Sequence, residues 1–140
     1  MKEYSFLNTL FLINGVEMDG YDEGDDVITV ERINDSANHK IGTDGEMTLS
    51  ISADRSGQIT FRLMQTSDSN KYLCGLINAQ ENGAFVPIFA QFKDTKGLDF
   101  ASGTQGYIKR PASMTRGTNA NSQEWIVVVE RLDMLHLGGV

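Results

Sequence analysis

The sequence predicts a mainly β protein, an antiparallel β-barrel or sandwich of six to seven strands with one flanking α-helix at about residues 67–81. Two observations predict this class. Short apolar, β-branched runs recur along the chain and are separated by polar or glycine-containing turns. Only one stretch places its apolar residues at helical spacing. The 140 residues suit one domain, which we expect to span residues 1–140.

The clearest strand pair is a predicted hairpin over residues 46–63. Polar and apolar residues alternate from residue 46 to 53 and again from residue 58 to 63, as in strands with one buried face. Residues 54–57, Asp-Arg-Ser-Gly, suit a short connection between them. We therefore expect one dry face and one wet face. The wet face carries Thr48, Ser50, Ser52, Gln58, Thr60 and Arg62.

Other runs rich in apolar and β-branched residues complete the predicted strands. Pro87 places its strand at an edge or at its own start, whereas the last strand is apolar on both faces and is expected to be covered. The remaining predicted strands are residues 6–16 (bent at Asn14-Gly15), 27–33, 86–93, 99–109 and 124–132.

The predicted helix has recognisable ends and one apolar stripe. Ser67 or Asp68 can cap its start, and Asn82-Gly83 suits its end. The stripe consists of Tyr72, Leu73, Leu76 and Ile77. We expect it to pack on the outside of the strands.

Charge and composition exclude several classes of function. The formal net charge is −7, and no run of Lys or Arg predicts recognition of nucleic acid through a basic patch. An acidic surface can still let DNA pass without binding it. The apolar run at residues 6–13 is too short for a membrane span and no small-residue cleavage site follows it. We expect a protein that is neither secreted by a signal peptide nor inserted in a membrane.

No group of residues predicts catalysis or a cofactor. The single cysteine, Cys74, has only Lys71 near it on the helix, and His39 and His136 lie far apart in the chain. A nucleophile needs an activating partner, and acid–base catalysis needs positioned groups. We therefore expect no enzyme, no catalytic residue, no metal ligand and no cofactor.

Two polar segments are predicted contacts between copies of the chain. Residues 17–26 hold six acidic side chains; calcium could use such oxygens, but the EF-hand register is missing. Residues 34–45 are expected to form a long polar loop, which in a compact domain is usually functional. The residues proposed for inter-subunit or inter-ring contacts are Asp19, Asp22, Asp25, Asp26, Asp35, Asn38, His39 and Lys40.

Several stretches together resemble the tail tube proteins of contractile-tailed bacteriophages. They cover most of the chain apart from residues 34–43 and 97–123, and they are strand, turn and helix-cap residues without a catalytic motif. The matching stretches are Tyr4-Ser5-Phe6, Gly45-Glu46 with the strand after it, Ala53 to Gly57, Ile59 to Leu63, Gln65-Thr66-Ser67, Asn70, Leu73, Asn78-Ala79-Gln80 and Glu124-Trp125.

This resemblance implies a structural protein of the virion tail, assembled in the bacterial host cytoplasm. Six copies would close into a ring, and the rings would stack into a hollow tube. The hairpin sheets would join into one barrel around a lumen that conducts double-stranded DNA during genome ejection, without specific binding. The implied partners are further copies of the chain, the tail sheath protein, and the tape-measure, baseplate and tail-terminator proteins; no membrane is implied.

The small, polar character of the predicted wet face fits the wall of a channel, so we expect this face to line or border the lumen. Arg62 is an exception, because a cation would slow DNA, and we expect it to pair with Glu46 or Asp54. Two alternatives stay open at this point. One is a tube protein similar to that of type VI secretion systems. The other is a small calcium-dependent carbohydrate-binding module that uses the acidic segment.

Overall fold

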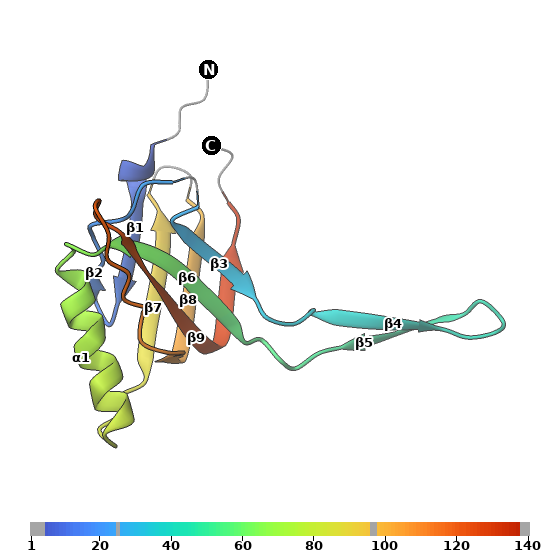
Figure 1. Cartoon of the computed structure of the whole chain (residues 1–140). Coiled ribbons are helices and arrows are strands. Elements are labelled where there is room, and N and C mark those ends of the chain that lie inside the picture. The colour runs from blue at the N-terminus through green and yellow to red at the C-terminus, as the bar shows by residue number, and fades with distance from the viewer. Residues whose placement is uncertain (1–4, 25, 96–97, 138–140) are drawn as a thin grey trace.

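The computed structural model describes residues 5–24, 26–95 and 98–137. The chain forms a rolled antiparallel sheet, one α-helix on its outside and a long hairpin that leaves the body (Figure 1). The elements in order are η1 (Phe6–Asn8, a 3-10 turn), β1 (Thr9–Ile13), β2 (Val16–Glu17), β3 (Ile28–Arg32), β4 (Ala37–Ile41), β5 (Met47–Ile51), β6 (Gly57–Met64), α1 (Ser69–Glu81), β7 (Ile88–Asp94), β8 (Phe100–Ile108) and β9 (Ser122–Leu135).

The body is a seven-stranded sheet in the order β2-β1-β7-β8-β9-β6-β3. The long strand β9 joins its two halves: Ser122 to Val129 pair with β6, and Val127 to Leu135 pair with β8. At the bend, Gly57 of β6 packs directly against Leu132, and an added Cβ would clash with its side chain. The sheet therefore folds over on itself, which confirms the predicted barrel or sandwich class.

The interior of the rolled sheet is apolar and closely packed. The alternate residues Ile59, Phe61 and Leu63 of β6 are fully buried, as the alternation predicts. The Phe61 ring meets Phe11 of β1 edge-on, with ring centroids 4.9 Å apart. Strand β9 contributes Val127 and Val129 to the same core. Strands distant in the sequence thus share one hydrophobic core.

Helix α1 lies along the outside of the body, as predicted (Figure 1). Its buried residues include Leu73 and Ile77, from the expected apolar stripe. Asp68 precedes the helix without a capping bond, whereas the Ser67 hydroxyl accepts a hydrogen bond from the Ser69 N–H at 3.2 Å. Asn82 ends it, followed by Gly83 at φ +81°. The helix begins two residues after the expected start and ends at the expected residue, Glu81.

The predicted pairing of residues 46–53 with 58–63 is wrong. Strand β5 pairs with β4, in register Ala37 with Ile51 and Ile41 with Met47, while β6 pairs with β3 and β9. One long hairpin therefore runs out through β3 and β4 and returns through β5 and β6. Residues 42–46 form its tip, where the Gly45 N–H donates to the Gly42 carbonyl at 2.9 Å and Gly45 has φ +86°.

Two segments expected to be irregular or simply bent have regular structure. Residues 34–45, predicted as a polar loop, contain strand β4 and the tip of the long hairpin. The predicted bend at Asn14-Gly15 is a two-residue turn between β1 and β2, with positive φ at both residues. In both places a short polar segment reverses the chain between strands, where the sequence indicates a loop at residues 34–45 and a bend at Asn14-Gly15.

Candidate functional site

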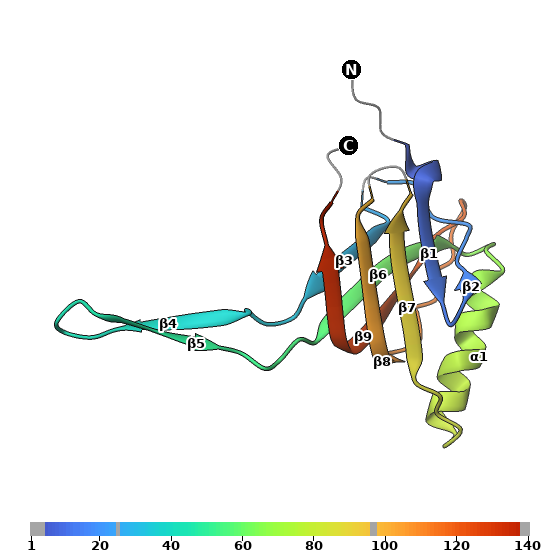
Figure 2. The same ribbon diagram turned by 180° about the vertical axis from the view of Figure 1, so that it is seen from behind.

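The β4–β5 hairpin projects from the body as a separate arm. We define the arm as residues 34–55, and two views from opposite sides show it extending away from the barrel (Figures 1 and 2). From residue 34 to the tip it can span roughly 35 Å at the usual rise of an extended strand. Its strands form a two-stranded sheet of their own. The arm therefore lies outside the core that stabilises the body.

The pairing register gives the arm one apolar and one polar face. Side chains that share a face come from directly paired residues and alternate along each strand. The apolar face holds the pairs Ile41 with Met47, His39 with Leu49 and Ala37 with Ile51. The polar face holds the pairs Lys40 with Thr48 and Asn38 with Ser50.

The apolar face of the arm is open to solvent in the single chain. Ile41, Met47 and Leu49 are about 60% exposed and Ile51 is 77% exposed. A lone two-stranded hairpin is at best marginally stable in water, and fully burying such a side chain contributes about 1.5–3 kcal/mol. Exposed apolar residues gathered on one face are typical of a surface that another protein covers.

Asp54 holds together the two segments that connect the arm to the body. Its carboxylate accepts hydrogen bonds from the Ser56 N–H at 2.9 Å, the Ser56 hydroxyl at 2.7 Å and the Asn34 amide at 2.6 Å. The backbone bond from Ser56 is the main cause that lowers the pKa of Asp54, followed by the hydroxyl of Ser56 and the amide of Asn34. The carboxylate stays charged at neutral pH and keeps the arm's two connections close to each other.

A polar face of the barrel carries the other half of the predicted wet face. Gln58, Thr60 and Arg62 alternate with the buried residues of β6 and lie on its outer side. The Gln58 amide donates to the Glu31 carboxylate at 2.9 Å, and Arg62 pairs across strands with Glu124. The six predicted wet-face residues therefore belong to two places, because Thr48 and Ser50 lie on the arm and Ser52 lies at its base.

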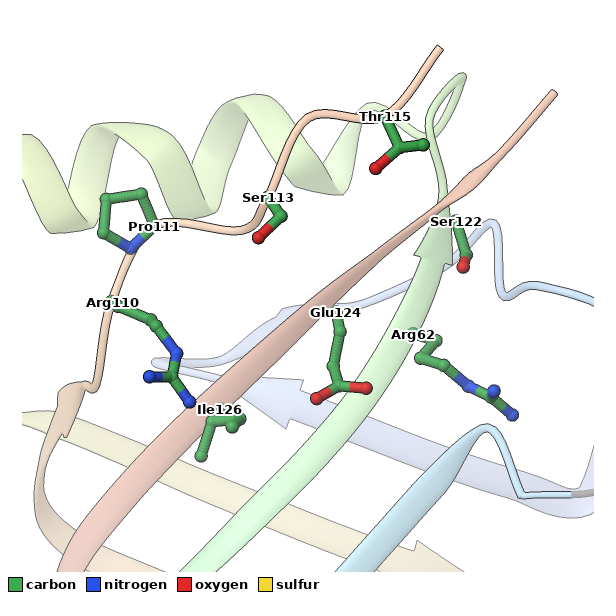
Figure 3. Close-up of a pocket in the computed structure, with 8 residues that line it drawn as sticks. All are labelled: Arg62, Arg110, Pro111, Ser113, Thr115, Ser122, Glu124 and Ile126. Atoms are coloured by element: carbon green, nitrogen blue, oxygen red, sulfur yellow. The ribbon is translucent and has the colours of Figure 1, made fainter. Parts of the chain in front are cut away.

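Arg62 borders a polar hollow of about 580 Å³ on this outer face. Figure 3 shows the Glu124 carboxylate between Arg62 and Arg110. The hydroxyls of Ser113 and Thr115, from the segment after β8, also line the hollow. The Arg62 guanidinium donates to the Asp26 carbonyl at 3.0 Å. Its expected pairing with Glu46 or Asp54 is wrong, because those residues lie on the arm. The hollow's lining is Arg62, Arg110, Pro111, Ser113, Thr115, Ser122, Glu124 and Ile126.

The acidic segment 17–26 is bound to the body. Asp19 is tied to the start of helix α1: its N–H donates to the Ser69 hydroxyl at 3.1 Å, and its carbonyl accepts from the Ser67 hydroxyl at 2.7 Å. The Asp22 N–H donates to the Arg62 carbonyl at 3.2 Å. Asp26 is exposed, while Asp25 lies outside the described residues. This segment has a structural role, and its predicted contact role stays a prediction.

Further observations concern metal ligands, Cys74, Tyr21 and membrane spans. Within the described ranges, no three His, Cys, Asp or Glu side chains come together as metal ligands. Cys74 is exposed on helix α1. Burial is the main cause that raises the pKa of Tyr21, and the nearby Glu17 and Asp19 raise it further. Over the described chain, no helix has the length and apolar character to cross a membrane.

The residues predicted for contacts between copies lie only partly on the arm, and their contact role stays a prediction. Asn38, His39 and Lys40 lie on the arm, in strand β4, and Asp35 lies at its base, just before this strand. The sequence predicts all four residues to lie in a loop. Periodicity does not indicate that the apolar residues of the arm are exposed, because alternation predicts an apolar face without saying which chain covers it. Gly42-Thr43-Asp44-Gly45 was the available indication, since it is as good a turn as residues 54–57 and lies between two short alternating segments.

Comparisons with solved structures support the fold. The sheath/tube terminator of an extracellular contractile injection system (PVC, extended state) is similar with a TM-score of 0.71 and 10% identity, covering 96% of this chain and 98% of that one. The PVC sheath-tube complex in its extended state gives 0.67 and 11%, covering 96% and 92%. A native gene transfer agent virion gives 0.57 and 13%, covering 95% and 99%.

No curated protein sequence matches the chain. A family model does: that of the bacteriophage PhiTE tail tube protein, which matches residues 1–138. The match includes the body and the arm. The chain therefore belongs to the bacteriophage PhiTE tail tube protein family and has the structural role of a tail tube protein.

Proposed function

We propose that the chain assembles as stacked rings of six copies into the inner tube of a contractile phage tail, and that the tube is the channel for genome ejection. The observation that carries this proposal is the arm, whose apolar face is exposed in the single chain and has no role in the body's core. A protein that keeps such a surface in water would lose solubility unless other copies cover it. The membership of the tail tube family supports the same conclusion.

The edges of the sheets support assembly by strand addition. In the part of the chain that the structure describes, β3 and β2 end the main sheet, and β4 and β5 each have a second, unpaired side. Backbone donors and acceptors at such edges pair readily with a strand of another molecule. Contacts between unlike surfaces of identical copies close into rings when the rotation allows it, and a second such contact stacks the rings.

The polar face of β6 is the part of the barrel that we propose for the lumen. Gln58 and Thr60 are uncharged, and Arg62 has Glu124 as its cross-strand neighbour, so the face offers DNA little fixed positive charge. With a formal net charge of −7, the chain as a whole repels phosphate. Thr48 and Ser50, on the polar face of the arm, would then border the lumen where the arm meets a neighbouring copy.

Charge substitutions on the phage test the lumen assignment separately from assembly. Gln58→Lys with Thr60→Lys is expected to leave virions assembled but to slow DNA ejection, since cations on the wall would bind phosphate. Gln58→Glu with Thr60→Glu is the matched control and is expected to eject normally. Equal ejection rates for both variants would place this face elsewhere than the lumen.

The proposed partners follow from this role. They are further copies of the chain, the sheath outside the tube, the terminator at one end, the baseplate at the other and the tape-measure protein inside, with assembly in the host cytoplasm. The structures similar in fold include sheath-tube and terminator proteins of an extracellular contractile injection system. An injection-system tube is therefore the second candidate, which the genes next to this one would distinguish by the presence or absence of capsid genes.

Negative-stain microscopy of the purified protein tests the proposal. Hollow tubes or six-fold rings are the expected result. The matched control replaces residues 35–52 by a short Gly-Ser loop, which should keep the fold of the body and lose the assemblies. A wild-type protein that stays monomeric at high concentration, with and without preformed baseplates, would contradict the proposal.

A further inference from the structure

A seam separates β3 from the C-terminal half of β9. Among the described residues, β3 has a neighbouring strand, β6, on one side only, and the part of β9 beyond Leu132 pairs with β8 alone. The two unpaired sides lie near each other at one end of the body (Figures 1 and 2). A mostly apolar groove of about 170 Å³ lies in the seam; its lining includes Ile28, Val30, Phe92, Phe100 and Met134, together with the polar residues Asp99 and His136.

The backbone along the seam offers unused hydrogen-bonding groups. The Arg62 N–H donates to the Val27 carbonyl and the Ile33 N–H to the Ser56 carbonyl, so every second residue of β3, beginning with Val27, points to β6. In an antiparallel ladder the intervening residues, Ile28 and Val30, therefore point their N–H and C=O groups into the seam. Within the described chain these groups have no hydrogen-bond partner.

The other side of the seam is closed at its base and open above it. The Leu132 N–H donates to the Arg55 carbonyl at 2.8 Å, and the Leu132 carbonyl accepts from the Arg32 guanidinium at 2.9 and 3.1 Å. By the same alternation, the backbone of Met134 points into the open part of the seam. Each wall of the groove is thus a strand edge with backbone groups that are free in the described part of the chain. At the base, the Arg55 carbonyl and the Arg32 side chain join the two walls through Leu132.

We propose that β5 from the arm of a second copy lies in this seam, pairs with the edge of β3 and packs its apolar face into the groove. Strands β5 and β3 have the same length of five residues. Pairing along β3 would place Met47, Leu49 and Ile51 towards Ile28 and Val30, and both apolar surfaces would leave water. The proposal rests on the proposed self-assembly of the chain and names the surface that receives the arm.

The occupant is a second copy because the chain's own arm points away from the body (Figures 1 and 2). The size of the arm also fits a contact between proteins. It has about 20 residues, which is close to the number that each partner contributes to a standard interface. The same chain therefore supplies an exposed apolar strand and an unpaired edge beside an apolar groove, and six copies would use every arm and every seam once.

Cross-linking between two variants tests the seam directly, in a Cys74→Ser background. One copy carries Leu49→Cys and the other Val30→Cys, with different affinity tags, and the mixture is assembled and treated with a short bismaleimide. We expect a cross-linked dimer with both tags. The matched control pairs Ser50→Cys with Val30→Cys, and its yield should be at least five-fold lower, because Ser50 lies on the opposite face of the arm.

Hydrogen exchange of the wild-type protein provides a second measurement that needs no substitution. The amides of Ile28, Val30 and Met134 are expected to exchange at least ten-fold more slowly in tubes than in the free chain. Tubes in which these amides exchange as in the free chain, or in which the two cysteine pairs cross-link equally, would overturn the seam assignment and leave the proposed function standing. A wild-type chain that never forms tubes would overturn both.

Discussion

Strands β5 and β6 follow each other in the chain and share one alternating pattern, yet their apolar residues have opposite surroundings. Ile59, Phe61 and Leu63 of β6 are at most 1% exposed, whereas Met47, Leu49 and Ile51 of β5 are 59–77% exposed. The alternation gives both strands an apolar face. It does not state which chain covers that face. In β6 the cover is the barrel's own core, and in β5 we infer that it is another copy.

The largest effect expected from this comparison is on assembly. Leu49→Asp places a charge in the centre of the arm's apolar face and should abolish tubes while the thermal unfolding of the free chain stays as in wild type, since burying an unpaired carboxylate is costly. Electron microscopy and calorimetry on the same sample measure both. Ser50→Asp, on the polar face, is the control and should still form tubes. Normal tubes from Leu49→Asp would show that this face is not an interface.

Truncating the buried strand should affect the fold itself. Phe61→Ala removes a fully buried ring that packs against Phe11, and we expect the free energy of unfolding to fall by about 3–5 kcal/mol. Leu49→Ala should change it by less than about 0.5 kcal/mol, because the side chain has few contacts in the free chain. Denaturant titration of the unassembled protein gives both values. Similar losses for the two variants would mean that the free arm folds back on the body.

Substitutions of two glycines compare a crowded backbone position, at the bend of the sheet, with an open one on helix α1. Gly57→Ala would push a Cβ into the Leu132 side chain and towards the Glu31 carbonyl, which should cost about 1–3 kcal/mol of stability. Gly75→Ala, on the exposed side of helix α1 with open space around it, should stabilise by about 0.5–1 kcal/mol. Melting temperatures that move in opposite directions are the expected result; a neutral Gly57→Ala would contradict the close packing at the bend.

The smallest expected effect is a pH dependence at the base of the arm. Because the pKa of Asp54 is lowered in the folded chain, its hydrogen bonds contribute at neutral pH and are lost as the pH falls through that lowered value. Below about pH 4, where unperturbed aspartates protonate, the arm's base should progressively loosen. The protection factor of the Ser56 amide, measured by hydrogen exchange as a function of pH, reports this change. Asp54→Asn removes the titrating group, so in that variant the protection factor should not change over the same pH range.

Features of the fold that depend on residues close together in the sequence could be predicted. The core face of β6, the covered last strand β9, and the stripe and ends of helix α1 follow from periodicity and capping. Most residues of the barrel's polar face could be predicted in the same way, because they alternate with the core residues of β6. These parts of the fold are confirmed by the structure.

Pairing between strands could not be predicted in the same way. Residues 42–45 and 54–57 are both acceptable turns, and the choice between them depends on whether β6 pairs with β5 or with β3 and β9. That choice is made by the barrel's core, which involves strands more than 60 residues later in the chain. Strand β4 resembles a loop in composition because both of its faces are exposed, so burial did not select its residues.

A cryo-EM reconstruction of assemblies formed by the purified wild-type chain would show which surfaces join the copies. We expect hollow tubes of stacked six-membered rings, in which the face of each arm that carries Ile41, Met47, Leu49 and Ile51 is covered by another copy. Tubes in which this face remains in solvent, with the copies joined through other surfaces, would contradict this expectation.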